Sequence, residues 1–133
     1  MADRGTSDEA ADWGAVDTYF IDTLGLEDAA LAAARESSSE TTMPDIEVTA
    51  TQGALLALLT RMCGARRVLE FGTLTGYSAI WFARAVGEGG RVVSLELEEL
   101  HAEIARRNFE LAGVSERIDV LVGSAAASAH GLI

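Results

Sequence analysis

The stretch "LEFGTLTGYSAIWFARA", residues 69–85, decides the fold of this chain. A short apolar run ends at Phe71, two glycines four residues apart follow as Gly72 and Gly76, and a helix-like run begins at once. Strand, tight turn and helix in this order are typical of parallel α/β sheets, which bind ligands at the carboxyl ends of their strands. The stretch therefore predicts a nucleotide-like ligand at this turn.

The glycine pattern does not match a phosphate-binding turn. The dinucleotide fingerprint needs a third glycine that lets the backbone approach a pyrophosphate, whereas Leu74 stands between the two glycines here. The Gly-Lys-Ser/Thr sequence of a P-loop is also missing, so a P-loop is excluded. An NAD-dependent oxidoreductase consequently remains only as a minor alternative.

An acid stands where a pyrophosphate binder would not place one. Glu70 ends the predicted strand, and a carboxylate close to a pyrophosphate would cost on the order of 1 kcal/mol or more. The same carboxylate favours a ligand with a positive centre, a ribose and an adenine, which describes S-adenosylmethionine. Glu96 ends the next predicted strand, where an acid accepts hydrogen bonds from ribose hydroxyls. Both acids also have a simpler reading as ordinary residues at strand ends.

The rest of the chain alternates between strand and helix patterns, which predicts an α/β, Rossmann-like, doubly wound parallel sheet preceded by N-terminal helices. We expect residues 1–11 to be disordered and residues 12–133 to form one partial domain that is truncated before a fourth strand. Thr49 and Gln52 form a capping-box pattern at a helix start. The predicted helices cover about 13–24, 26–35, 50–63, 78–86 and 98–112, and the predicted strands cover 68–71, 91–96 and 118–122. In the helix 50–63 the apolar residues share one face, namely Leu55, Leu58, Leu59 and Met62. In the helix 98–112 we expect Leu100, Ile104 and Leu111 to face inward.

Composition excludes several classes of protein. The 133 residues carry a formal charge of −11, which argues against nucleic acid or an anionic membrane surface as a partner. The acidic N-terminus lacks the apolar segment of a secretory signal. A single cysteine, Cys63, excludes an internal disulfide and fits a reducing compartment. We therefore predict a cytoplasmic protein with a small-molecule substrate.

Several conspicuous side chains have ordinary interpretations. Trp81 and Phe82 are expected in the core and not as ligand contacts, while Tyr77 either lines the ligand site or only covers it. His101 and His130 have no metal-binding spacing and are expected on the surface. Cys63 is expected to be a small buried residue.

The signature Glu-x-Gly-x-x-x-Gly-Tyr-Ser, Glu70 through Ser78, resembles that of the cation-dependent O-methyltransferases of catechol and of caffeoyl-coenzyme A. The segments "DIEVTATQG" (45–53) and "ARRNFELAGVSERI" (105–118) are similar to the segments that flank this signature in the family. The likeness covers about residues 12–131. It implies an S-adenosylmethionine-dependent methyl transfer to the hydroxyl of a catechol-like or acyl-coenzyme A acceptor.

The resemblance also implies cofactor contacts at the amino-acid end of S-adenosylmethionine. Val48 matches a backbone contact near the methionine end. Glu70 matches the acid beside the methionine portion. Ser78 matches a hydroxyl that holds the amino-acid end.

The remaining implied contacts lie along the nucleoside. Gly72 and Thr73 match the turn beneath the ligand. Glu96 matches the ribose acid. Ala125 matches the position beside the adenine, where its backbone amide would serve.

The chain departs from the family in length. Family members typically exceed 200 residues and supply later in the chain two Asp and an Asn that bind a divalent cation such as Mg²⁺, which orients the substrate hydroxyl. Those ligands and the catalytic base are absent from these 133 residues, so we nominate no catalytic residue and expect no methyl transfer by this stretch alone. A non-catalytic binding module with the same fold is the main alternative. The resemblance also implies a possible homodimer.

Overall fold

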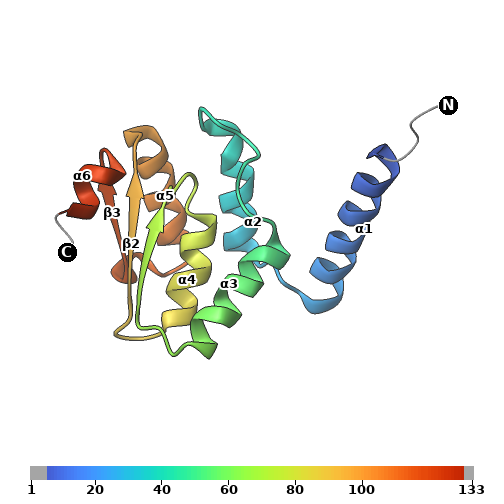
Figure 1. Cartoon of the computed structure of the whole chain (residues 1–133), viewed down its shortest axis with the longest axis horizontal. Helices are drawn as coiled ribbons and strands as arrows, with labels where there is room; N and C mark the ends of the chain where they lie inside the picture. The colour runs from blue at the N-terminus through green and yellow to red at the C-terminus, as the bar shows by residue number, and fades with distance from the viewer. Residues whose placement is uncertain (1–5, 131–133) are drawn as a thin grey trace.

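The computed structural model describes the backbone of residues 6–130 and the side chains of residues 13–128. Three parallel strands form one sheet in the order β1-β2-β3, with β2 in the middle (Figure 1). The predicted bounds of β2 and β3 are confirmed, and β1 begins one residue before the prediction. The strands are β1 (Arg67–Phe71), β2 (Arg91–Glu96) and β3 (Ile118–Val122).

Helices alternate with these strands, as the sequence predicts for an α/β fold. Helix α4 connects β1 to β2 and α5 connects β2 to β3, and both pack against the sheet. Helix α2 packs on α4 and α5, and α3 packs on α4 (Figure 1). The helices are α1 (Thr6–Leu24), α2 (Ala29–Glu36), η1 (Ser37–Glu40), α3 (Ala50–Met62), α4 (Tyr77–Val86), α5 (Glu99–Leu111), η2 (Ser115–Arg117) and α6 (Ala125–His130).

The core lies between the sheet and this helical layer. Ile80 of α4, Val92 of β2 and Phe109 of α5 are buried there, together with Leu31 of α2. Burying each such side chain contributes about 1.5–3 kcal/mol. Neighbouring residues on β1 alternate in exposure, because Glu70 faces the helices while Leu69 and Phe71 are exposed on the other side.

Two inward-facing predictions for α5 were wrong. Ile104 is buried as expected, but Leu100 and Leu111 are exposed. The small residues Ala102 and Ala105 line the inner face with Ile104, since the sheet approaches this helix closely. The spacing of the large hydrophobic residues therefore did not identify the buried face of α5.

Helix α3 begins as predicted and exposes its leucines. The Thr49 hydroxyl accepts the Gln52 amide N–H and the Gln52 side chain accepts the Thr49 N–H, which confirms the capping box. The buried face is small and is formed by Ala50, Gly53 and Ala57, with Gly53 directly against the Trp81 ring. The apolar face read from the sequence lies largely in solvent within the described residues; its members are Leu55, Leu58, Leu59 and Met62.

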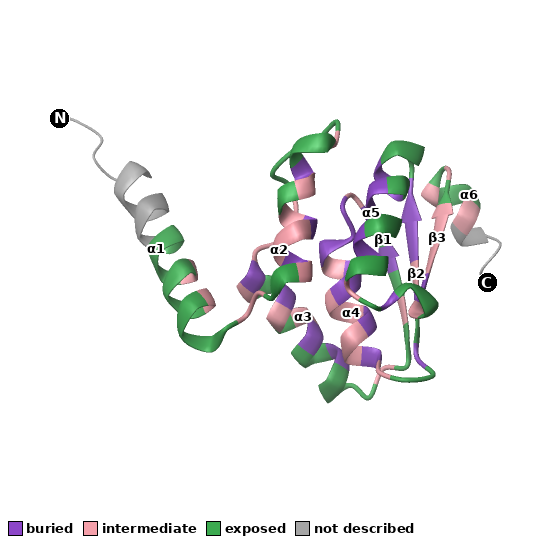
Figure 2. Cartoon of the chain, turned by 180° about the vertical axis from the view of Figure 1, so that it is seen from behind, coloured by how far each residue is buried: buried purple, intermediate pink, exposed green. Residues whose placement is uncertain are grey.

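Helix α1 projects from the rest of the chain, as Figure 2 shows by its exposed surface. The Thr51 hydroxyl donates to the Asp17 carboxylate at 2.6 Å and ties α1 to α3. The helix begins at Thr6, earlier than predicted, so the backbone is helical over residues 6–11; the disorder expected for residues 1–5 lies outside the described residues. No helix in the described part of the chain is long and apolar enough to cross a membrane.

Candidate functional site

The turn between β1 and α4 is built from left-handed backbone conformations. Gly72 has a φ of 89° and Gly76 a φ of 80°, values that favour glycine. Leu74 also takes a positive φ, of 50°, which is rare for a residue with a side chain. A Cβ atom at Gly76 would overlap the Phe109 ring, so this glycine lets α5 approach the turn closely.

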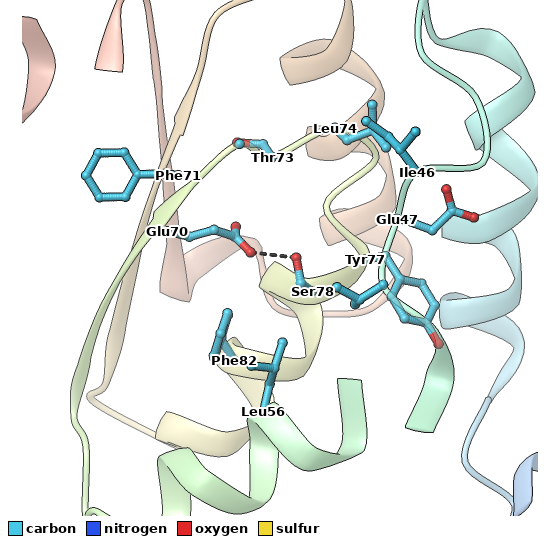
Figure 3. A pocket seen from close by; sticks show the side chains of 12 residues that line it. Ile46, Glu47, Leu56, Glu70, Phe71, Thr73, Leu74, Tyr77, Ser78 and Phe82 are labelled. Carbon is cyan, nitrogen blue, oxygen red and sulfur yellow. Dashed lines mark hydrogen bonds between the residues drawn. The ribbon is translucent and has the colours of Figure 1, made fainter. Parts of the chain in front are cut away.

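A cavity of about 360 Å³ opens beside this turn, between α3 and the carboxyl end of β1 (Figure 3). Five of the seven residues predicted from the sequence to contact the ligand line it together, although they come from two separate parts of the chain, residue 48 and residues 70–78. Glu96 and Ala125 are not among the lining residues. The five are Val48, Glu70, Gly72, Thr73 and Ser78.

Glu70 is the buried acid of this cavity. The Ser78 hydroxyl donates to its Oε1 at 2.5 Å (Figure 3), and the Ser94 hydroxyl donates to its Oε2 at 2.6 Å. Burial raises the pKa of Glu70 above its ordinary value, and the nearby Glu96 carboxylate acts in the same direction. The two serine hydroxyls oppose this shift without cancelling it. A cation in the cavity would favour the carboxylate form and lower the pKa again.

Glu96 lies under the same turn and holds its backbone. Its Oε2 accepts the N–H groups of Thr73 and Leu74, both at 2.9 Å. Its Oε1 accepts those of Leu97 and Glu98, at 2.8 and 3.0 Å. Burial raises the pKa of Glu96, but these amide donors outweigh burial and hold the pKa below its ordinary value. The pKa values of the two strand-end acids are therefore shifted in opposite directions.

The wall opposite β1 is fixed by a cluster of charged residues around Arg35 of α2. Arg35 donates to Glu27 at 2.8 Å and to Glu47 at 3.3 Å, and it also reaches the Val48 carbonyl. The Arg35 guanidinium lies over the Tyr77 ring, 4.3 Å from the ring centre. These contacts hold the Glu47–Val48 segment against the turn.

Tyr77 both lines the cavity and packs in the core. Its hydroxyl donates to Glu27 at 2.6 Å. Burial and this hydrogen bond raise the pKa of Tyr77 to about 12, so the phenol stays protonated. The sequence left open whether Tyr77 lines the ligand site or only covers it, and in the structure it does both.

Ala125 begins α6, next to the end of β3. The Gly123 N–H donates to the Glu96 carbonyl at 2.7 Å, which keeps this segment beside the end of β2. Ala125 is partly exposed and does not line the cavity. Its predicted place beside an adenine stays a prediction.

Other single-residue expectations fared unevenly. Cys63 is exposed, because it caps the C-terminus of α3 instead of packing in the core. The expected surface position of His101 was wrong. This α5 residue is buried, because the segment at Thr42 packs against its ring. Trp81 and Phe82 pack against the core as expected, and Phe82 also lines the cavity. The side chain of His130 lies outside the described residues.

Sequence reasoning missed Ser94 and the apolar lining. Ser94 is fully buried in the middle of an apolar strand, and this unusual place for a hydroxyl was the available signal. Ile46 and Leu56 carry no local signal, because tertiary packing brings the segment before α3 and the face of α3 that packs on α4 to the cavity. Among the described residues, no group of three or more His, Cys, Asp or Glu side chains is placed to hold a metal ion.

Comparison with known protein families identifies the family of this chain. The model of the O-methyltransferase family matches residues 22–133. The chain belongs to the O-methyltransferase family. This family assignment and the parallel sheet with flanking helices confirm the expected Rossmann-like methyltransferase fold.

Individual O-methyltransferases support the assignment. The catechol O-methyltransferase of Mycobacterium tuberculosis is 51% identical over 110 residues, which cover 83% of this chain and 50% of that protein. The enzyme of the same name from Niastella koreensis is 46% identical over the same shares. This O-methyltransferase chain thus spans about half the length of the curated relatives that it matches.

Solved O-methyltransferases share the fold. TomG from Streptomyces achromogenes, solved in complex with SAM, is 44% identical with a TM-score of 0.85, over 89% of this chain and 53% of that one. An O-methyltransferase from Bacillus cereus, solved with SAH, is 44% identical with a TM-score of 0.84, over 89% and 54%.

Proposed function

We propose that this chain carries the cofactor-binding half of an S-adenosylmethionine-dependent O-methyltransferase. The observation that carries the proposal is the buried Glu70 at the mouth of a cavity beside a turn whose glycines fit no phosphate site. The SAM and SAH complexes of structurally similar relatives support it. The acceptor is the hydroxyl of a small molecule of catechol or acyl-coenzyme A type.

The residues at the turn fit the positive end of this cofactor. S-adenosylmethionine supplies a methyl group on a positively charged sulfur. Glu70 would hold the methionine portion, with Ser78 at its amino-acid end and the Val48 backbone on the opposite wall. A cation beside Glu70 offsets the desolvation of a carboxylate that carries no other positive partner in the described residues.

The nucleoside would lie along the strand ends. Gly72 and Thr73 would pass beneath the cofactor, since Gly72 presents no side chain toward the cavity. Glu96 would accept the ribose hydroxyls and the Ala125 amide would face the adenine. No group of side chains in the described part of the chain is placed to hold a metal ion, and the acceptor hydroxyl would be bound by the rest of the family's length.

Titration calorimetry with S-adenosylmethionine, S-adenosylhomocysteine and NAD tests this proposal. We expect binding of both sulfur nucleosides and weaker binding or none of NAD. Tighter binding of NAD would overturn the proposal in favour of an oxidoreductase. Binding of S-adenosylmethionine without methyl transfer from a radiolabelled donor, in a protein that contains the rest of the family's length, would favour the non-catalytic binding module.

Two further properties belong to the same proposal. We infer a cytoplasmic location, which the acidic composition and the exposed thiol of Cys63 support. We also infer a homodimer, which the exposed apolar side chains of α1 and β1 support, among them Phe20 and Phe71. Sedimentation equilibrium at several concentrations measures the second property, and a monomer at all of them would contradict it.

A further inference from the structure

His101 lies directly behind the proposed ribose acid. Its side chain is only 4% exposed, and its Nδ1 is 3.4 Å from Oε1 of Glu96. On its other side, Nε2 accepts the backbone N–H of Thr42 at 3.2 Å. The imidazole therefore connects the segment after η1 with the carboxylate at the end of β2.

The hydrogen-bond pattern assigns the tautomer of His101. Because Nε2 accepts the Thr42 N–H, it carries no proton itself, and the ring proton of the neutral imidazole is on Nδ1. The Thr42 hydroxyl is 2.9 Å from Nε2 and donates to the Glu98 carboxylate, so it needs no proton from the ring. Glu98, whose Oε2 is 3.8 Å from Nε2, is the other charged group beside the ring. Nδ1, which carries the proton, therefore lies on the side of the ring next to Glu96, 3.4 Å from its Oε1.

The two oxygens of Glu96 have different surroundings. Oε1 faces His101 and the amides of Leu97 and Glu98, all of which belong to the start of α5 or the residues before it. Oε2 accepts only the amides of Thr73 and Leu74, which belong to the turn beside the cavity. A carboxylate has about four acceptor sites, so ribose hydroxyls can bind only where turn amides give way.

We propose that His101 is a positioning residue that anchors Glu96 through Oε1, so that Oε2 can exchange a turn amide for a ribose hydroxyl of the cofactor. The proposal rests on the function proposed above and deepens it, because it assigns the two carboxylate oxygens different tasks. The hydrogen bonds that Glu96 accepts in the described structure come from backbone amides, and His101 is the side chain whose nitrogen lies beside its carboxylate, 3.4 Å from Oε1 and buried where the strand end meets α5. Without it, Oε1 keeps only the amides of Leu97 and Glu98, and the carboxylate can turn more freely.

Three substitutions separate anchoring from packing. The amide nitrogen of His101→Asn can take the place of Nδ1, that of His101→Gln can take the place of Nε2, and His101→Phe fills the space without a donor. Each variant is titrated with S-adenosylhomocysteine and with its 2′,3′-dideoxy analogue, which lacks the hydroxyls. Circular dichroism and thermal unfolding check the fold, and the Asn–Gln comparison stands if the Phe variant does not fold.

We expect His101→Phe and His101→Gln to weaken S-adenosylhomocysteine about fivefold to tenfold, whereas the dideoxy analogue changes less than about twofold. We expect His101→Asn to stay within about twofold of wild type for both compounds. Equal losses for both compounds, or for Asn and Gln alike, would show that His101 only packs. A wild-type protein that binds neither compound would overturn the proposed function itself, and this inference with it.

Discussion

Ser78 and Glu70 face each other across the turn between β1 and α4, with the serine hydroxyl 2.5 Å from the glutamate Oε1 (Figure 3). Ser94 reaches the other oxygen from β2 and is itself 2.6 Å from the Thr73 hydroxyl. A buried carboxylate thus has two hydroxyl donors, and its pKa is nevertheless raised. This relationship places a proton-sensitive group at the mouth of the cavity.

We predict that cofactor binding weakens as the pH falls through the raised pKa of Glu70. The ordinary value is 4.5, so the loss begins above that pH, because protonation removes the charge that the sulfonium and ammonium need. At a pH near the raised pKa of Glu70, where part of the carboxyl is protonated, cofactor binding releases a proton from Glu70. Calorimetry in two buffers of different ionisation enthalpy measures the release, and pH-independent binding without proton release would contradict it.

The variant Glu70→Gln supplies the matching stability test. A carboxyl whose pKa is higher in the folded than in the unfolded state binds more protons when folded, so its stability contribution falls as the pH rises between the two values. We therefore expect Glu70→Gln to unfold no more easily than wild type at pH 7, while its cofactor affinity and the pH dependence are lost. Urea denaturation at pH 5 and pH 7 measures the first expectation.

We predict that Glu96→Ala weakens S-adenosylmethionine binding by about 1.5–3 kcal/mol, the range for hydrogen bonds to a charged group. The substitution also leaves the Thr73 and Leu74 amides without their acceptor, so the turn loses support. Glu99→Ala is the control, because Glu99 is exposed on the same helix start and pairs only with Arg106 in the described structure. Titration calorimetry should show wild-type cofactor affinity for Glu99→Ala. If Glu96→Ala bound the cofactor as tightly as Glu99→Ala, Glu96 would not contact the ligand.

We predict that Gly72→Val abolishes cofactor binding while secondary structure remains. No atom lies within 4 Å of a Cβ at Gly72, so the protein has room for the side chain, but that space belongs to the cavity. The left-handed backbone adds a strain of about 1–2 kcal/mol. Gly113→Val is the matched control, with a φ of 66° and equally open surroundings away from the cavity. Both variants should lose similar stability, and unchanged affinity of Gly72→Val would place Gly72 away from the ligand.

We predict that Gly53→Ala destabilises the fold by about 1–3 kcal/mol, because the added methyl group would overlap the Trp81 ring and push α3 from α4. Gly14→Ala is the control, since Gly14 also lies in a helix and no atom is within 4 Å of its Cβ position. Alanine there should stabilise the helix by about 0.5–1 kcal/mol. Chemical denaturation measures the free energy of unfolding of both variants. If Gly53→Ala changed it no more unfavourably than Gly14→Ala, the contact between Gly53 and Trp81 would accommodate a methyl group without cost.

The sequence by itself determined the order of strands and helices, the glycine turn and the two acids at strand ends. These features depend on neighbours along the chain: the run before Gly72, the capping box at Thr49 and the bounds of β2 and β3 all follow from local backbone preference and hydrophobic pattern. The parallel order also follows, because helices between successive strands leave few other arrangements.

Only the tertiary structure decided which side of each helix is buried and what surrounds the acids. Leu100 and Leu111 are exposed while Ala102 and Ala105 are inside, because close helix–sheet packing selects small side chains. His101 is buried because Thr42, 59 residues earlier in the chain, packs against it. Glu70 and Glu96 look alike in the sequence, yet burial raises the pKa of one and backbone amides lower that of the other. Desolvation and hydrogen-bond donors come from distant segments, and local sequence does not contain them.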